Sequence, residues 1–102
     1  MDKIEQKICD IIDAHREELI AFGEDLWTHA ELGFQEFRTA EKFAEKMKGL
    51  GLRTQEGLAV TGVKSYLKDD AHGPTVCLMG EFDGLPIPTH AYANPETGAA
   101  HC

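Results

Sequence analysis

The sequence predicts an α/β fold in which two helices precede a small antiparallel sheet. Three observations support this prediction. Apolar residues in the first 50 positions recur at three- and four-residue steps, which is typical of amphipathic helices. Residues 52–67 are instead rich in β-branched, aromatic and small residues. Residues 75–80 (TVCLMG) are apolar at successive positions, which is typical of an interior strand buried on both faces.

The first predicted helix covers about residues 3–30. Asp2 and Glu5 fit a capping box at its start. Its apolar stripe consists of Ile4, Ile8, Ile11, Ile12, Leu19, Phe22, Leu26 and Trp27. The second predicted helix covers roughly residues 35–50. Glycines at positions 49 and 51 mark its end, and two lysines in its last turn complement the helix dipole.

The predicted sheet has one strand at about residues 60–67 and another at residues 75–80, and a short strand at 53–56 would make a third. The turn-forming cluster at 68–74 is short, so we expect an antiparallel hairpin between the two main strands. An interior strand needs neighbouring strands and helices on both faces. Two helices cannot supply these, so we expect an incomplete sheet and a missing C-terminal portion.

Composition excludes several classes of partner. The 102 residues, enough for one small domain, include 18 acidic and 10 basic residues, a net charge of −8, which argues against a nucleic-acid or membrane partner. No apolar run approaches the roughly 20 residues that a membrane span needs. The three cysteines show no CxxC spacing and favour a reducing, cytoplasmic location. We expect Cys9 and Cys77 to be small core residues.

Two carboxylates, Glu81 and Asp83, follow the second predicted strand. Side chains two residues apart on an extended chain point to the same side, and close carboxylates repel unless a cation, a proton or an arginine lies between them. A divalent metal is one solution, and solvated acids at a strand end are the alternative. His90, His101 and Cys102 follow and suit zinc, although their spacing matches no compact zinc motif.

Four stretches, in order, complete the pattern: LWTHAELGFQE (26–36), TGV (61–63), GEFDGLP (80–86) and GAAHC (98–102). Together they resemble the N-terminal end of the zinc-dependent metallopeptidase and amidohydrolase family that includes hippurate hydrolases, auxin-conjugate amidohydrolases and aminobenzoyl-glutamate hydrolases. Ala30 stands where the family usually has Pro, Trp27 where many members have His, and Gly84 where Ala is usual. The loop at 87–97 is longer than in many relatives.

The resemblance implies that residues 1–102 are the N-terminal portion of a catalytic domain. Its fold would be a fragment of an α/β/α sandwich, without the rest of that domain or the dimerisation domain. A complete member would hydrolyse the amide bond of N-acyl amino acids with zinc or manganese, as a homodimer. Residues 1–102 would be inactive alone, since the general base and the metal ligands are expected beyond Cys102.

The resemblance also carries roles over to single positions. Asp83 matches the Asp that supports and orients the metal site, so it is the candidate catalytic residue. Glu81 stands where dizinc members have a His ligand. His101 matches the His that opens the C-G-H motif and is not itself a usual ligand. No metal ligand and no cofactor are therefore expected within this chain alone.

Two other interpretations follow from the same residues. The chain could be a non-catalytic interaction subunit that pairs with a larger partner through an exposed sheet edge. It could also be an independent metal-binding module built on His90, His101 and Cys102, which would fold only with its metal.

Overall fold

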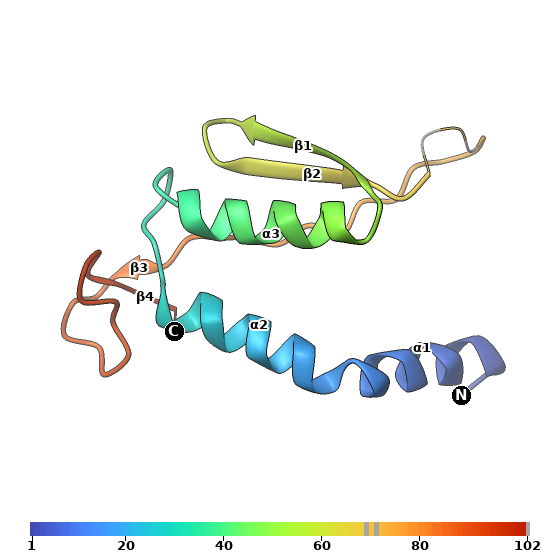
Figure 1. Ribbon diagram of the computed structural model, residues 1–102, viewed down its shortest axis with the longest axis horizontal. Coiled ribbons are helices and arrows are strands. Elements are labelled where there is room, and N and C mark those ends of the chain that lie inside the picture. Colours follow the sequence, from blue (N-terminus) through green and yellow to red (C-terminus); the bar gives the residue numbers. More distant parts are fainter. Residues whose placement is uncertain (69, 71, 102) are drawn as a thin grey trace.

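The computed structural model describes residues 1–68, 70 and 72–101. Figure 1 shows the elements in chain order, which are α1 (Lys3–Ala14), α2 (Arg16–Thr28), α3 (Phe37–Gly49), β1 (Arg53–Leu58), β2 (Gly62–Tyr66), β3 (Leu85–Pro86) and β4 (Ala99–Ala100). The predicted α/β class, with small antiparallel sheets, is confirmed. Within the described ranges, no helix is long and apolar enough to cross a membrane.

The predicted N-terminal helix is two helices joined at His15. The capping box is confirmed, because the Asp2 carboxylate accepts from the backbone N–H of Glu5 at 2.9 Å while the Glu5 carboxylate accepts from the N–H of Asp2 at 2.7 Å. The backbone of His15 (φ −104°, ψ 11°) then leaves the helical region. The apolar stripe lapses between Ile12 and Leu19, so no packed face holds a single helix across this point. Neither α1 nor α2 has a buried residue.

The helix α3 forms as predicted and packs against the hairpin of β1 and β2. The two strands are antiparallel, with Arg53 opposite Tyr66. Ala59 and Val60 in the turn have φ angles of 46° and 82°, an unusual conformation for residues with a Cβ. The hairpin therefore joins the short strand to the strand predicted at 60–67, and the predicted pairing of 60–67 with 75–80 is wrong.

The prediction of a buried strand at residues 75–80 is also wrong. This segment has no regular secondary structure, and Val76, Leu78 and Met79 are 86–98% exposed. In the part of the chain that the structure describes, the segment belongs to neither sheet, so no hydrogen-bonded ladder holds it as a strand. Cys77 in this segment and Cys9 in α1 are exposed, so neither is the core residue that we expected.

The buried core is small and comes from the segment after α2, from α3 and from β4. The buried apolar residues are Ala30, Ala44, Ala99 and Ala100, and Thr39 is the largest fully buried side chain. The radius of gyration is 16.0 Å, whereas a compact domain of 100 residues has about 13 Å. The fold is therefore open, with α1 extending away from α3 and the hairpin (Figure 1).

Candidate functional site

The segment after α2, residues 30–36, contacts the TGV motif, the GEFDGLP motif and the loop before the GAAHC motif, and we call it the motif junction. It first fixes the start of α3. One carboxylate oxygen of Glu31 accepts from the backbone N–H and the hydroxyl of Thr39, both at 2.7 Å, and the other accepts from the N–H of Arg38 at 3.1 Å. The first N–H groups of a helix lack partners within the helix, and a carboxylate there also suits the helix dipole. Glu31 therefore caps α3 from outside it.

The end of the motif junction contacts the TGV motif. The hydroxyl of Thr61 donates to Glu36 Oε2 at 2.5 Å, and both residues are buried. Burial opposes ionisation of Glu36, but the bond from Thr61 and bonds from backbone N–H groups outweigh it and lower the pKa of Glu36. The neighbouring Gly62 is required by space, since a Cβ there would lie 2.5 Å from the Leu58 carbonyl oxygen.

The GEFDGLP motif contacts the motif junction through Gly84. Its N–H donates to the Glu31 carbonyl at 2.7 Å, and Leu32 and Gly84 form an isolated parallel bridge. A Cβ on Gly84 would lie 3.0 Å from the Ala100 carbonyl oxygen and 3.2 Å from the Ala30 Cβ. The close approach of these three segments thus explains glycine at this position.

The GAAHC motif reaches the same place through the loop before it. The Ala30 carbonyl accepts from Thr97 Oγ1 at 2.7 Å and from Asn94 Nδ2 at 3.1 Å. Asn94 is buried, and its own N–H donates to the Ala99 carbonyl at 2.8 Å. The short strands β3 and β4 then pair, with Leu85 opposite Ala100. The loop at 87–97 is consequently an ordered part of the site.

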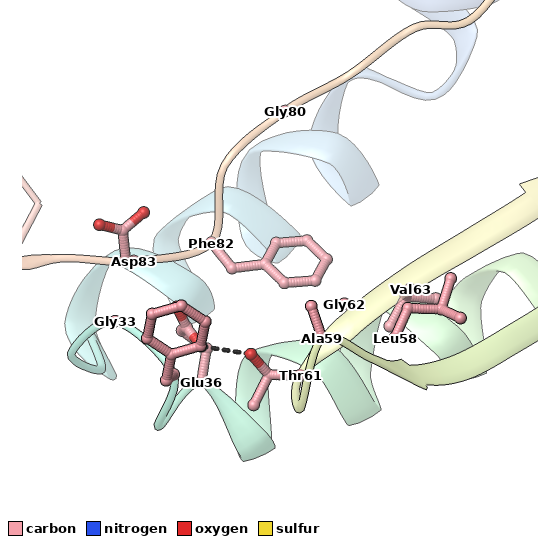
Figure 2. Close-up of a pocket in the computed structure, with 11 residues that line it drawn as sticks. Gly33, Glu36, Leu58, Ala59, Thr61, Gly62, Val63, Gly80, Phe82 and Asp83 are labelled. Carbon is pink, nitrogen blue, oxygen red and sulfur yellow. Dashed lines mark hydrogen bonds between the residues drawn. The ribbon is translucent and has the colours of Figure 1, made fainter.

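Asp83 lies at the edge of a hollow of about 380 Å³ between the motif junction, the β1–β2 turn and the segment before β3. Figure 2 shows the ring of Phe82 pointing into this hollow and the carboxylate of Asp83 pointing away from that ring. Asp83 is exposed, but its backbone is fixed because the next residue, Gly84, is bonded to Glu31. Its predicted catalytic role stays a prediction.

Glu81 lines a second hollow, of about 250 Å³, together with His101, Trp27 and Phe82. The lining of this hollow does not include Asp83, and that of the first does not include Glu81. Neither of these two hollows is lined by both carboxylates, although we expected the two side chains to point to the same side. The structure instead brings Glu81 together with His101, which is 20 positions further along the chain.

Of the predicted zinc-type residues, the structure describes His90 and His101. Among the residues that the structure describes, no group of three His, Cys, Asp or Glu side chains is placed to hold a metal ion. His90 is occupied locally, because its Nδ1 accepts from the Tyr92 N–H at 3.2 Å. Cys102 lies outside the described residues. We therefore derive no chemical step through a metal from this donor set.

Comparison with known proteins addresses the predicted resemblance. YhaA of Bacillus subtilis, named as an amidohydrolase, is 30% identical over 101 residues, which are 96% of this chain and 26% of that protein. The N-acyl-L-amino acid amidohydrolase of Geobacillus stearothermophilus is 28% identical over 99 residues, 94% of this chain and 27% of that enzyme. One of the subunits of the p-aminobenzoyl-glutamate hydrolase of Escherichia coli is 28% identical over 86 residues, 83% of this chain and 18% of that subunit.

This chain is similar to the amidohydrolases. The predicted resemblance is confirmed at modest identity, and the chain spans about a quarter or less of the length of these relatives. No family model matches the chain. No solved structure matches it either.

Several contacts of the site were not predicted from the sequence. Glu31 caps a helix whose bonded N–H groups lie seven and eight residues away, outside the spacing of a capping box. Glu36 and Thr61 are 25 residues apart, and Asn94 and Ala30 are 64 apart. The one feature of the sequence that could have indicated these contacts is that the residues lie in or beside the four motifs.

Proposed function

We propose that this chain forms the N-terminal part of the catalytic unit of an amidohydrolase that acts on N-acyl amino acids. The convergence of the TGV motif, the GEFDGLP motif and the loop before GAAHC on residues 30–36, which belong to the first motif, carries the proposal. Gly84 and Thr61 bond to this segment from two of the motifs, and Asn94 bonds to it from the loop before the GAAHC motif. The name of the Geobacillus relative supports the substrate class, because that enzyme is an N-acyl-L-amino acid amidohydrolase.

In this proposal Asp83 is a positioning residue at the edge of the catalytic centre. The bond from Gly84 to the Glu31 carbonyl fixes the backbone beside it, and its exposed carboxylate is free to face further protein or ligand groups. Zinc or manganese would supply Lewis-acid chemistry in the complete enzyme, with ligands that are not among the described residues. A cytoplasmic location and a homodimer are part of the same proposal.

The test starts with the protein as its source cells make it. Its intact mass is measured first, against the 11.3 kDa of this sequence. The native protein is then assayed for amino-acid release from a panel of N-acyl amino acids, with zinc or manganese added and with a chelator. We expect metal-dependent release. A native protein that releases no amino acid from any acylated substrate, with either metal, contradicts the proposal.

The role of Asp83 is tested by Asp83→Asn, with Glu45→Gln as the matched control because Glu45 is an exposed acid on α3. Residues that orient a metal site typically change activity by about 10- to 100-fold when replaced. We expect a loss of that size for Asp83→Asn and none for Glu45→Gln. Equal activity of the two variants would show that Asp83 has no role in the catalytic centre.

A second candidate function is a non-catalytic subunit that pairs with a larger protein. The observation behind it is the exposure of Val76, Leu78 and Met79, because an exposed apolar segment can pair with a strand of another chain. Native mass spectrometry separates the two candidates. An inactive 11.3 kDa chain in a defined complex with a different, larger chain would support the subunit.

A further inference from the structure

Trp27, near the end of α2, contacts two separate points of the segment that follows β3. Its indole Nε1–H donates to the carbonyl oxygen of His101 at 3.2 Å. Its ring also lies against the ring of Tyr92, with the ring centres 4.4 Å apart and a tilt of 39°. One side chain therefore joins α2 both to the 87–97 loop and to the residue just after β4.

Tyr92 also contacts His90. The ring of His90 lies 6.1 Å from that of Tyr92, and the Nδ1 of His90 accepts from the Tyr92 N–H. Offset or tilted aromatic pairs at such distances are favourable beyond the area that they bury. The contacts with His90 therefore fix the ring of Tyr92. The packing of Trp27 on this ring orients the indole so that its N–H points to the His101 carbonyl.

The place of His101 depends on the same contact. Trp27, Glu81 and His101 all line the hollow of about 250 Å³. β4 consists of only Ala99 and Ala100, so pairing with β3 ends just before His101. The indole bond holds the His101 backbone at a point beyond the end of the sheet.

We propose that Trp27 is a positioning residue, which fixes His101 beside Glu81 through its bond to the His101 carbonyl and its stacking on Tyr92. The role goes beyond the proposed function, since it concerns how the chain places His101 and does not depend on what reaction follows. It also gives a structural reason for a tryptophan at this position.

The test uses NMR of the full chain, because the sequence has a single Trp and its indole N–H signal is therefore unambiguous. The first measurement is the hydrogen exchange rate of that N–H in the unmodified protein. A net hydrogen bond of ordinary strength slows exchange roughly two- to tenfold relative to a free indole. Exchange at the free rate would overturn the proposal, whatever any variant does.

The second measurement follows the ring signals of His101 in three variants. Trp27→Phe keeps a ring that can stack on Tyr92 but lacks the donor, and Tyr92→Leu removes the stacking. Phe37→Leu is the matched control, since Phe37 is an exposed aromatic residue on α3. We expect the His101 signals to move in the first two variants and to stay in place in the third.

The two contacts can also be separated. Tyr92→Leu should speed the exchange of the Trp27 indole N–H, because the ring that orients it is gone. Unmoved His101 signals in a folded Trp27→Phe protein would overturn the positioning role. Neither measurement involves hydrolysis, so an inactive protein would contradict the proposed function without touching this inference.

Discussion

Replacing Thr61 with Val tests the contact between the motif junction and the β1–β2 hairpin. The substitution keeps the side-chain shape but removes the hydroxyl that donates to Glu36 at 2.5 Å. Glu36 is only 7% exposed, so water cannot readily replace the lost donor. A hydrogen bond to a charged group contributes about 1.5–3 kcal/mol, and we expect the free energy of unfolding to fall by that amount.

The assay is urea unfolding at pH 7, followed by circular dichroism. With a urea dependence of about 2 kcal/mol per molar, the midpoint should fall by roughly 1 M. Thr89→Val is the matched control, because Thr89 is exposed and the same substitution there should change stability by less than about 0.5 kcal/mol. Equal midpoints for the two variants would refute the reasoning.

The pH dependence of this loss gives a second test. The folded-state pKa of Glu36 lies below its ordinary value of 4.5, so the stability it contributes is present above pH 4.5. That contribution is lost as pH falls through the lowered pKa. In Thr61→Val the burial of Glu36 remains without its donor, so the pKa of Glu36 should rise. The stability difference between the two proteins should therefore shrink below pH 4.5, and a constant difference would argue against an ionised Glu36.

Three further substitutions test other contacts. Gly84→Ala should lower the free energy of unfolding by about 1–3 kcal/mol, because the added Cβ would overpack against backbone atoms. Gly80→Ala is the control and should not lower it, because the space around Gly80 is open. Equal urea midpoints for the two variants would contradict the close approach at Gly84. Arg38→Met should raise the pKa of Asp25, which the hydrogen bond from Arg38 lowers, and an unmoved carboxylate titration by NMR would count against this bond. Leu78→Asp should change the stability of the chain alone by less than about 0.5 kcal/mol, because Leu78 is 98% exposed. A loss above about 2 kcal/mol would mean that this segment is buried in solution.

The local elements of the fold were predictable because their signals are local. The Asp2 and Glu5 capping box and the helical periodicity before residue 50 depend on residues three or four positions apart, and the capping box and the helix α3 are confirmed. The hairpin pairing was wrong because its turn uses Ala59 and Val60 with positive φ angles, for which no Gly or Asn marks the place.

The strand prediction at residues 75–80 failed for a different reason. Its apolar composition indicates what the segment would do between neighbouring strands, and the described residues provide none. Composition alone cannot say whether such neighbours exist. Cys77 was expected in the core on the same basis and is exposed with the rest of the segment.

The sequence motifs named candidate residues but did not predict how these residues lie relative to one another. The motifs identified Asp83, Glu81 and His101, but alternate spacing on the chain did not predict that Glu81 would share a hollow with His101 and not with Asp83. That arrangement depends on long-range bonds, such as those from Asn94 and Thr97 to the Ala30 carbonyl. Bonds between residues so far apart leave no periodic pattern in the sequence from which they could be predicted.

The convergence of the motifs on residues 30–36 is tested most directly by a nuclear Overhauser spectrum of the labelled protein. The deciding signals join the methyl protons of Ala30 to the α protons of Gly84. These groups must lie in contact, because a Cβ on Gly84 would be 3.2 Å from the Ala30 Cβ. Our account predicts strong cross-peaks between them. A folded protein without these cross-peaks would show that the GEFDGLP motif does not reach the motif junction, and would contradict the account.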